Sequence, residues 1–206
     1  ITLWGRGTPG MVLHVDLAGA RDTARVADDG RWRLRLPAMP AGGPHRLLLW
    51  GAGEFIEWAD VWIGDVWLCA GQSNMAWPLA QARHGATDVA MDAPLIRQLR
   101  VPNRASLLPA EDIAPARWVV ARPGATAEFS AVAWYFARRL QAEPDYAGVP
   151  IGLINVAWNG SNLEAWVRHG AVLEDPAEAE LAAVLRGLPT DPADYATMLR
   201  ERVHGA

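Results

Sequence analysis

The chain has 206 residues, a formal net charge of −4 at pH 7 and a hydrophobic content of 51%, which are ordinary values for one or two globular domains. The acidic balance argues against a nucleic-acid partner, because such a partner requires a basic face. No apolar run approaches the roughly 18 residues of a membrane-spanning helix, so no membrane partner is expected. The single cysteine, Cys69, cannot form an internal disulfide, and we expect it to be a buried apolar side chain rather than a nucleophile.

The first 62 residues contain short runs in which apolar and polar side chains alternate. The clearest runs are 12–17, 23–26, 32–36 and 45–50. This period is typical of antiparallel strands with one face toward water. Asp28-Asp29-Gly30 predicts a hairpin turn, with Gly30 at positive φ. Residues 1–62 are therefore predicted to form a small β-sandwich module, complete or in part.

From residue 63 onward the spacing lengthens into strand–helix–strand units, which predicts a parallel sheet with helices on its faces. Residues 66–69 form a continuous apolar run, typical of a parallel strand buried on both faces. Residues 149–157 predict a central strand, and residues 175–205 predict helical segments.

A helix is predicted for residues 130–141, with Ser130 as its N-cap. Its apolar residues recur at helical spacing and are expected to face the core. They are Val132, Ala133, Phe136, Ala137 and Leu140. Four tryptophans in apolar strand-like runs, Trp32, Trp50, Trp67 and Trp118, are also expected in the core.

Two turns carry the candidate site. Ser73 follows the strand at residues 66–69, and Gly160 follows the strand at residues 149–157. Open α/β sheets bind ligands beyond the carboxyl ends of their strands, so the two turns should lie near each other. Ser73 is expected to open a helix, where free backbone N–H groups favour developing negative charge. It is therefore the candidate nucleophile.

The residues around Ser73 exclude two familiar sites. Met75 stands where the Gly-x-Ser-x-Gly turn of ordinary lipases has its second glycine. Residues 70–73 carry neither a Gly-x-Gly-x-x-Gly pattern nor the lysine of a phosphate-binding loop. A dinucleotide- or phosphate-binding half-domain is therefore rejected.

Three ordered blocks, residues 64–79, 129–138 and 149–166, resemble the sialate O-acetylesterases of the SGNH hydrolase superfamily. The resemblance implies a three-layer α/β/α, flavodoxin-like sheet for residues 63–206, incomplete in this chain. It also implies a serine esterase that needs no metal and no organic cofactor. By the same resemblance, a periplasmic or secreted location is expected rather than a cytoplasmic one.

Ester cleavage needs a nucleophile, a base and donors to the carbonyl oxygen. The backbone N–H groups of Ser73 and Gly160 are the predicted oxyanion donors, since glycine lets the backbone approach the reacting oxygen. In the family this second block usually reads Trp-Gly-Gly-Thr, whereas here residues 158–161 read Trp-Asn-Gly-Ser. Asn159 reaches left-handed conformations less freely than glycine, so the backbone of this turn is expected to differ from the family's if position 159 requires positive φ.

Five residues around the two turns are candidates for substrate binding. They are Gln72, Asn74, Trp77, Trp158 and Asn159. The two that flank Ser73 either orient the acyl group or sugar, or satisfy local backbone groups. The two tryptophans are candidates for lining a sugar pocket, or else are packing residues. Glu164 is expected to form a capping box with Ser161 and, together with Trp166, to anchor a helix start.

The catalytic base is missing from the predicted site. In the SGNH pattern a histidine with an aspartate three residues before it arrives late in the sequence, and no such block is present here. The five histidines, at positions 14, 45, 84, 169 and 204, are expected to be structural; Glu201 stands where the last of them would need aspartate. The chain is therefore expected to be a piece of a longer protein, inactive without the missing C-terminal part of the same polypeptide.

Two functions stay open. In the first, Ser73 attacks the acetyl carbonyl of an O-acetylated sugar or glycan, and water then releases acetate from the acetyl-enzyme. In the second, the chain is a non-catalytic glycan-binding or scaffold fragment that lacks the catalytic histidine and aspartate. The intact nucleophile block favours the first function, and the missing histidine favours the second.

Overall fold

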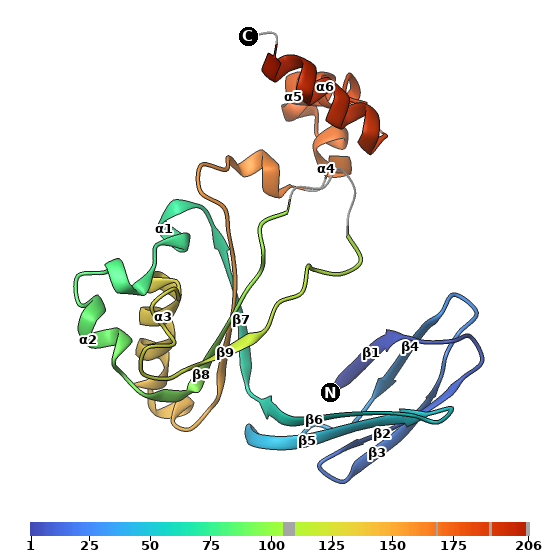
Figure 1. Cartoon of the computed structure of the whole chain (residues 1–206), viewed down its shortest axis with the longest axis vertical. Helices are drawn as coiled ribbons and strands as arrows, with labels where there is room; N and C mark the ends of the chain where they lie inside the picture. Colours follow the sequence, from blue (N-terminus) through green and yellow to red (C-terminus); the bar gives the residue numbers. More distant parts are fainter. Residues whose placement is uncertain (105–109, 168, 190, 205–206) are drawn as a thin grey trace.

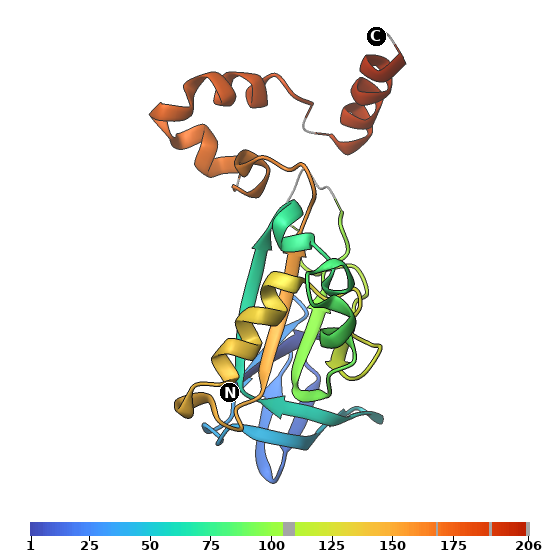
Figure 2. The ribbon, with the colours of Figure 1, turned by 90° about the vertical axis from the view of Figure 1, so that its left-hand side faces the viewer.

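A computed structural model describes residues 1–104, 110–167, 169–189 and 191–204. It shows a β part up to Ile63, an α/β part from Asp65 onward, and helices after residue 168 that extend away from the sheets (Figures 1 and 2). The predicted boundary after residue 62 falls at the end of the last strand of the β part. The division into two domains stays a prediction.

The β part contains two antiparallel sheets. Its strands are β1 (Thr2–Arg6), β2 (Val12–Leu17), β3 (Ala20–Arg25), β4 (Arg31–Arg35), β5 (Gly42–Gly51) and β6 (Glu54–Ile63). One sheet has the order β3-β2-β5-β6, and the other pairs β1 with β4. Alternate residues of β2 and β4, including Val15 and Leu34, point into one apolar cluster to which both sheets contribute side chains.

The turn at Asp28-Asp29-Gly30 lies where it was predicted, and Gly30 has φ 78°. The Gly30 N–H donates to the Ala27 carbonyl oxygen at 3.0 Å. The strands on either side, β3 and β4, belong to different sheets. The turn therefore carries the chain from one sheet to the other, and the predicted hairpin within a single sheet is wrong.

The α/β part is built on one mixed sheet. Its strands are β7 (Asp65–Gly71), β8 (Ala93–Arg100), β9 (Trp118–Ala121) and β10 (Ile151–Ala157). Their order is β7-β10-β8-β9. β7, β10 and β8 are parallel, and β10 is central as predicted. β9 runs antiparallel to β8, so the prediction of a wholly parallel sheet is wrong for this strand.

Short helices follow the strands. They are α1 (Ser73–Ala76), the 3₁₀ turn η1 (Leu79–Gln81), α2 (Gly85–Val89), α3 (Ala131–Gln141) and η2 (Pro144–Tyr146). Beyond the sheet come η3 (Leu163–Trp166), α4 (His169–Glu174), η4 (Pro176–Glu178), α5 (Ala179–Arg186) and α6 (Pro192–His204). α1, α2 and α3 lie on the same face of the sheet (Figure 1).

Helix α3 begins as predicted, because the Ser130 side chain accepts a hydrogen bond from the Ala133 N–H at 3.2 Å. The face that it buries matches the prediction in part, since Ala133 and Ala137 are buried and Leu140 packs against the core. Trp134 is completely buried, while Val132 and Phe136 are exposed. The large indole takes the centre of the buried stripe, with Ala133 and Ala137 beside it, and this rotates the helix away from the expected face.

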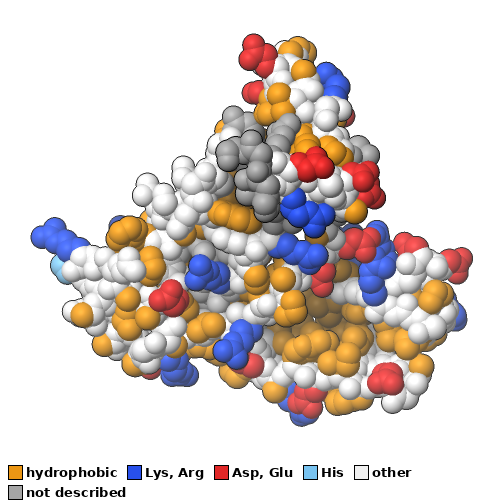
Figure 3. All heavy atoms as spheres, turned by 45° about the horizontal axis from the view of Figure 1, so that its top comes forward, with side chains coloured by type: hydrophobic (Ala, Val, Ile, Leu, Met, Phe, Trp, Pro, Cys, Tyr) orange, Lys and Arg blue, Asp and Glu red, His pale blue; other side chains and the backbone are white. Residues whose placement is uncertain are grey.

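The sheet face opposite α3 is open among the described residues. β7 is an edge strand, and Val66 and Leu68 are 61% and 69% exposed, so the prediction of burial on both faces is wrong. Trp67 and Trp118, predicted in the core, are exposed as well, whereas Trp32 is buried as predicted. Figure 3 shows hydrophobic side chains gathered in a hollow on this side of the molecule.

An ion pair joins the two parts of the chain. Asp60 of β6 accepts two hydrogen bonds, at 2.7 and 2.9 Å, from the Arg97 guanidinium of β8. The same guanidinium lies 5.1 Å from the centre of the Trp62 ring. Beside this pair is a cavity of about 550 Å³, lined in part by Trp58 and Trp118. The loop after β8 adds a second link, because Glu111 pairs with Arg6 and Arg31.

We predict that Asp60→Asn weakens the link between the two parts in a pH-dependent way. Hydrogen bonds from Arg97 lower the pKa of Asp60 below its ordinary value of 3.8. A lowered carboxyl pKa stabilises the fold above that ordinary value, and the stabilisation is lost as the pH falls through the lowered pKa. The native chain should have a higher free energy of unfolding than the variant at neutral pH, by at most about 1 kcal/mol because the carboxylate is exposed. This difference should become smaller as the pH falls toward 3.

Denaturant unfolding between pH 7 and pH 3 measures this difference. Asp28→Asn is the matched control, because Asp28 is exposed and has no ion-pair partner among the described residues. An equal effect of the two substitutions, or a difference for Asp60→Asn that does not change with pH, would contradict the prediction.

A second prediction concerns Tyr135, which ties α3 to α2. Its hydroxyl donates to the Asp88 carboxylate at 2.6 Å, and this bond raises the pKa of Tyr135 to about 12. In a spectrophotometric titration, one of the three tyrosines should therefore ionise last. Tyr135→Phe should remove that component and Asp88→Asn should move it to lower pH, while Tyr146→Phe leaves it in place. Persistence of the component in Tyr135→Phe would refute the assignment.

Candidate active site

Ser73 opens helix α1, as predicted from the sequence. β7 ends at Gly71, and Gln72 turns the chain before the helix. Because α1 has only four residues, its free N–H groups matter more than any helix dipole. The Ser73 side chain is exposed, and its hydroxyl makes no hydrogen bond with the rest of the described chain. A substrate can therefore reach it.

The turn before Ser73 needs glycine at position 71. A Cβ there would lie 3.0 Å from the Cβ of Met75, closer than side chains normally pack. The Ala76 N–H donates to the Gln72 carbonyl oxygen at 2.8 Å and closes the single helical turn. Met75 packs against the apolar core, so Gly71 lets the helix fold back directly over the strand that precedes it.

The turn that carries Gly160 starts one strand away. β10 pairs in parallel with β7, with Ala157 opposite Gly71. The pairing continues past the strand, because the Trp158 N–H donates to the Gly71 carbonyl oxygen at 3.0 Å. Both turns therefore leave the sheet at the same edge, where an open α/β sheet binds its ligand. The roles of Ser73 and Gly160 in catalysis stay predictions.

The left-handed position of this second turn is Gly160, with φ +73°. Asn159 does not have positive φ, so the exchange of the family's first glycine for asparagine puts no strain on the backbone. A Cβ at position 160 would meet no atom within 4 Å. Glycine is therefore required here for its backbone conformation and not for lack of space.

The predicted substrate-binding residues all lie open to solvent. Trp77 and Trp158 are 50% and 40% exposed. Gln72, Asn74 and Asn159 are exposed too, and their side chains form no hydrogen bonds with other described residues. The two polar residues that flank Ser73 thus do not satisfy local backbone groups. All five are free to contact a ligand, and their role in binding one stays a prediction.

Ser161 does not act as the predicted helix N-cap. Its hydroxyl donates to the Trp158 carbonyl oxygen at 2.8 Å and accepts from the Trp166 indole N–H at 2.9 Å. The segment that follows is the 3₁₀ turn η3. Trp166 anchors this turn as expected, whereas the Glu164 side chain lies outside the described residues. The hydroxyl therefore closes the Gly160 turn and is not available to cap a helix.

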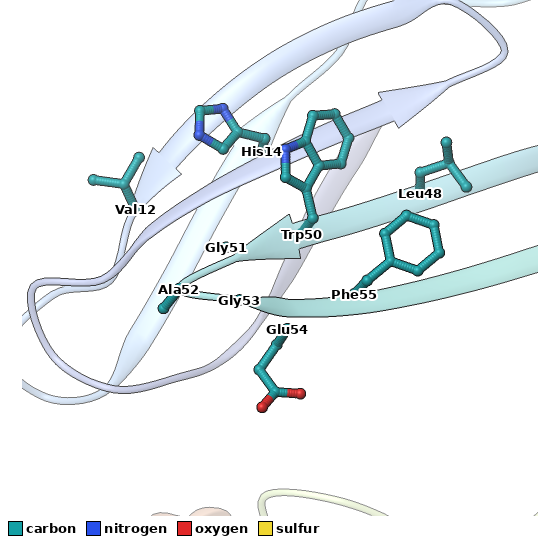
Figure 4. Close-up of a pocket in the computed structure, with 9 residues that line it drawn as sticks. All are labelled: Val12, His14, Leu48, Trp50, Gly51, Ala52, Gly53, Glu54 and Phe55. Carbon is teal, nitrogen blue, oxygen red and sulfur yellow. The ribbon is translucent and has the colours of Figure 1, made fainter.

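No described histidine side chain is hydrogen-bonded to Ser73. His14 stacks on Trp50 at 5.4 Å between ring centres, in a shallow pocket of about 630 Å³ on the β part (Figure 4). His45 lies in β5, and His84 is exposed before α2. The side chains of His169 and His204 lie outside the described residues.

The described residues offer little support for a cysteine nucleophile or a metal site. Cys69 is buried as predicted, and burial raises the pKa of its thiol, which disfavours the nucleophilic thiolate. Across the ranges that the structure describes, no group of three or more histidine, cysteine or acidic side chains is placed to hold a metal ion. Within the same ranges, every helix is too short or too polar to span a bilayer.

Sequence reasoning missed a set of buried polar side chains beneath α1. Asn155 of β10 donates from Nδ2 to the Met75 carbonyl oxygen at 3.4 Å, and Ser130 donates from Oγ to the Met75 sulfur at 3.4 Å. Gln98 of β8 accepts from the Ser130 N–H at 3.1 Å. The available signal was a polar residue at an inward position of an apolar strand, since β10 alternates buried and half-buried residues and Asn155 is a buried one.

Comparisons with known proteins agree with the resemblance seen in the sequence. A family model described as "Carbohydrate esterase, sialic acid-specific acetylesterase" matches residues 63–185, more than half of the chain. The sialate O-acetylesterases of Pongo abelii and Homo sapiens are 29% and 28% identical over 221 residues, covering 98% of this chain and 42% of each relative.

A solved structure of a carbohydrate acetylesterase from Xanthomonas citri superposes with a TM-score of 0.79 at 40% identity, covering 86% of this chain and 40% of that protein. The chain thus spans about two fifths of the length of its relatives. Because the family match spans more than half of the chain, the chain belongs to the sialic acid-specific acetylesterase family of carbohydrate esterases.

Proposed function

We propose that this chain is the nucleophile-bearing part of a carbohydrate O-acetylesterase that removes acetyl groups from O-acetylated sugars or glycans. One observation carries the proposal: an exposed Ser73 hydroxyl, with no hydrogen-bond partner among the described residues, lies at the end of the sheet where the Gly160 turn begins one strand away. The membership of the chain in a carbohydrate esterase family supports the same substrate class.

In the proposed reaction, Ser73 Oγ attacks the acetyl carbonyl carbon while a base takes the hydroxyl proton. The N–H groups of Ser73 and Gly160 stabilise the oxyanion, and one such donor typically contributes about 2.7–4 kcal/mol to transition-state stabilisation. The sugar hydroxyl leaves with the proton, and water then cleaves the acetyl-enzyme to acetate. Gln72 and Asn74 orient the acyl group, while Trp77, Trp158 and Asn159 contact the sugar. The mechanism uses no metal and no organic cofactor.

We assign the histidine and aspartate to a C-terminal part of the same polypeptide. The relatives are more than twice as long as the matched region, which supports this assignment. The free edge of β7, with its exposed Val66 and Leu68, supports it too. A further parallel strand along β7 would pair with its free backbone groups and end beside Ser73.

The finer architecture and the location belong to the same proposal. A second layer of helices over the open sheet face would complete a three-layer α/β/α fold, and it would cover the hydrophobic side chains of Figure 3. Side chains of both sheets in the β part share one apolar cluster, which supports a β-sandwich module there. By family resemblance we assign the protein to the periplasm or the extracellular space.

The second candidate function is a non-catalytic glycan-binding or scaffold protein. It is favoured by one observation, that no described histidine side chain is hydrogen-bonded to Ser73. The exposed Trp77 and Trp158 would serve glycan binding in either function. Activity of the parent protein separates the two.

We predict that Ser73→Ala removes esterase activity from the parent protein. Hydrolysis of an aryl acetate and of an O-acetylated sialic acid should fall by at least about a thousandfold, since the proposed attacking hydroxyl is lost. Thr87→Ala, which removes an exposed hydroxyl from α2, is the control and should keep full activity. The 206-residue piece alone should be nearly inert.

Two outcomes would contradict this account. Full activity of the Ser73→Ala protein would remove Ser73 from the mechanism. A native parent protein that binds acetylated glycans but releases no acetate would favour the scaffold function instead.

Another prediction for the site compares Gly160→Ala with Gly148→Ala. The two glycines have φ +73° and +79°, and at neither would a Cβ meet an atom within 4 Å. Both substitutions should therefore lower the free energy of unfolding by a similar amount, about 1–2 kcal/mol. Only Gly160→Ala should lower kcat, by up to about a thousandfold, because it shifts an oxyanion donor. Equal kcat in the two variants would rule out the proposed role of Gly160.

A further inference from the structure

Buried polar side chains are concentrated beneath the nucleophile helix. Asn155 is 4% exposed, and Gln98 and Ser130 are each 2% exposed. They come from β10, β8 and the N-cap of α3 respectively. Burying a polar side chain costs free energy unless it is hydrogen-bonded, so an apolar core would be simpler at these positions. Their partners show what they hold in place.

Asn155 is bonded to the helix that carries Ser73. Its Nδ2 donates to the carbonyl oxygen of Met75, at 3.4 Å. Met75 lies two residues after Ser73 in a four-residue helix, where carbonyl groups have no partner within the helix. The asparagine therefore supplies a hydrogen bond that the short helix cannot make for itself.

Met75 is held from two further sides. The Ser130 hydroxyl donates to its sulfur at 3.4 Å, while the Ser130 N–H is fixed by Gln98 at 3.1 Å. Gly71 lies against its Cβ, and a Cβ at position 71 would come within 3.0 Å of it. The one turn of α1 is thus tied through Met75 to β10, to α3 and to the end of β7. Of these contacts, the bond from Asn155 is the one that joins α1 to the strand leading into the Gly160 turn.

We propose that Asn155 is a positioning residue for the esterase reaction. Acting through the Met75 carbonyl, it holds α1 against β10, so that Ser73 keeps a fixed position relative to the turn at Gly160, which follows β10. The inference rests on the proposed function. A displacement of about 1 Å at a reacting group can cost about a hundredfold in rate, so a single supporting bond under a one-turn helix can have a large effect.

The test uses Asn155→Leu in the parent protein, which keeps the approximate shape and removes the donor. We expect kcat for an aryl acetate to fall about 10- to 100-fold with KM changed less than about twofold, because the ground-state contacts of the substrate are untouched. Thr126→Val is the matched control. Thr126 is equally buried, and its hydroxyl has no partner among the described residues, so kcat should stay at the native value.

Amide hydrogen exchange of residues 72–77 provides a readout that does not depend on catalysis. Loss of the Asn155 bond should speed exchange at Ala76, whose N–H closes the helical turn, while Thr126→Val leaves it unchanged. If Asn155→Leu fails to fold, Asn155→Ala lacks the same donor in a smaller side chain and is measured in the same way.

The outcomes separate this inference from the proposed function. Lower kcat together with faster exchange supports the positioning role. Native kcat in the Asn155 variant, at either exchange rate, overturns it. If the native parent protein releases no acetate, the proposed function fails, and exchange alone then decides whether Asn155 holds α1: faster exchange supports that contact, and unchanged exchange overturns it.

Discussion

The site depends on the parallel pairing of β7 with β10. Gly71 lies opposite Ala157, and the Trp158 N–H extends the pairing to the Gly71 carbonyl oxygen at 3.0 Å. Two parallel neighbours end at the same edge of a sheet, so the turns that follow them emerge side by side. A hydroxyl at position 73 and a glycine N–H at position 160, 87 positions apart in the chain, become a single candidate site through this constraint alone.

The proposed nucleophile, Ser73, is supported by very little secondary structure. Helix α1 has four residues and cannot hold itself rigid, since a single turn makes few internal hydrogen bonds. Its position comes from Met75, which packs on Gly71 and contacts Asn155 and Ser130. The hydroxyl of Ser73 is exposed and has no hydrogen-bond partner within the described part of the chain, while the Met75 carbonyl is bonded to the sheet. A rigid support beneath an accessible nucleophile is what acyl transfer requires.

Local signals in the sequence predicted the parts of the structure that depend on neighbouring residues. The helix start at Ser73, the Ser130 cap and the central place of β10 follow from turn residues, capping chemistry and an apolar run. The sequence did not predict features that depend on distant contacts. The direction of β9, the exposure of Val66 and Leu68, and the rotation of α3 around Trp134 depend on which elements pack together. Asn155 was missed because its role depends on a carbonyl 80 residues earlier in the chain.

The most direct test of the account is a crystal structure of the parent protein after reaction with an alkyl phosphonate ester, whose tetrahedral phosphorus imitates the acyl-transfer intermediate. The account predicts phosphorus bonded to Oγ of residue 73, with a phosphoryl oxygen about 2.7–3.1 Å from the backbone nitrogens of residues 73 and 160. Phosphorus on another side chain, or a phosphoryl oxygen directed away from the turn after β10, would contradict it.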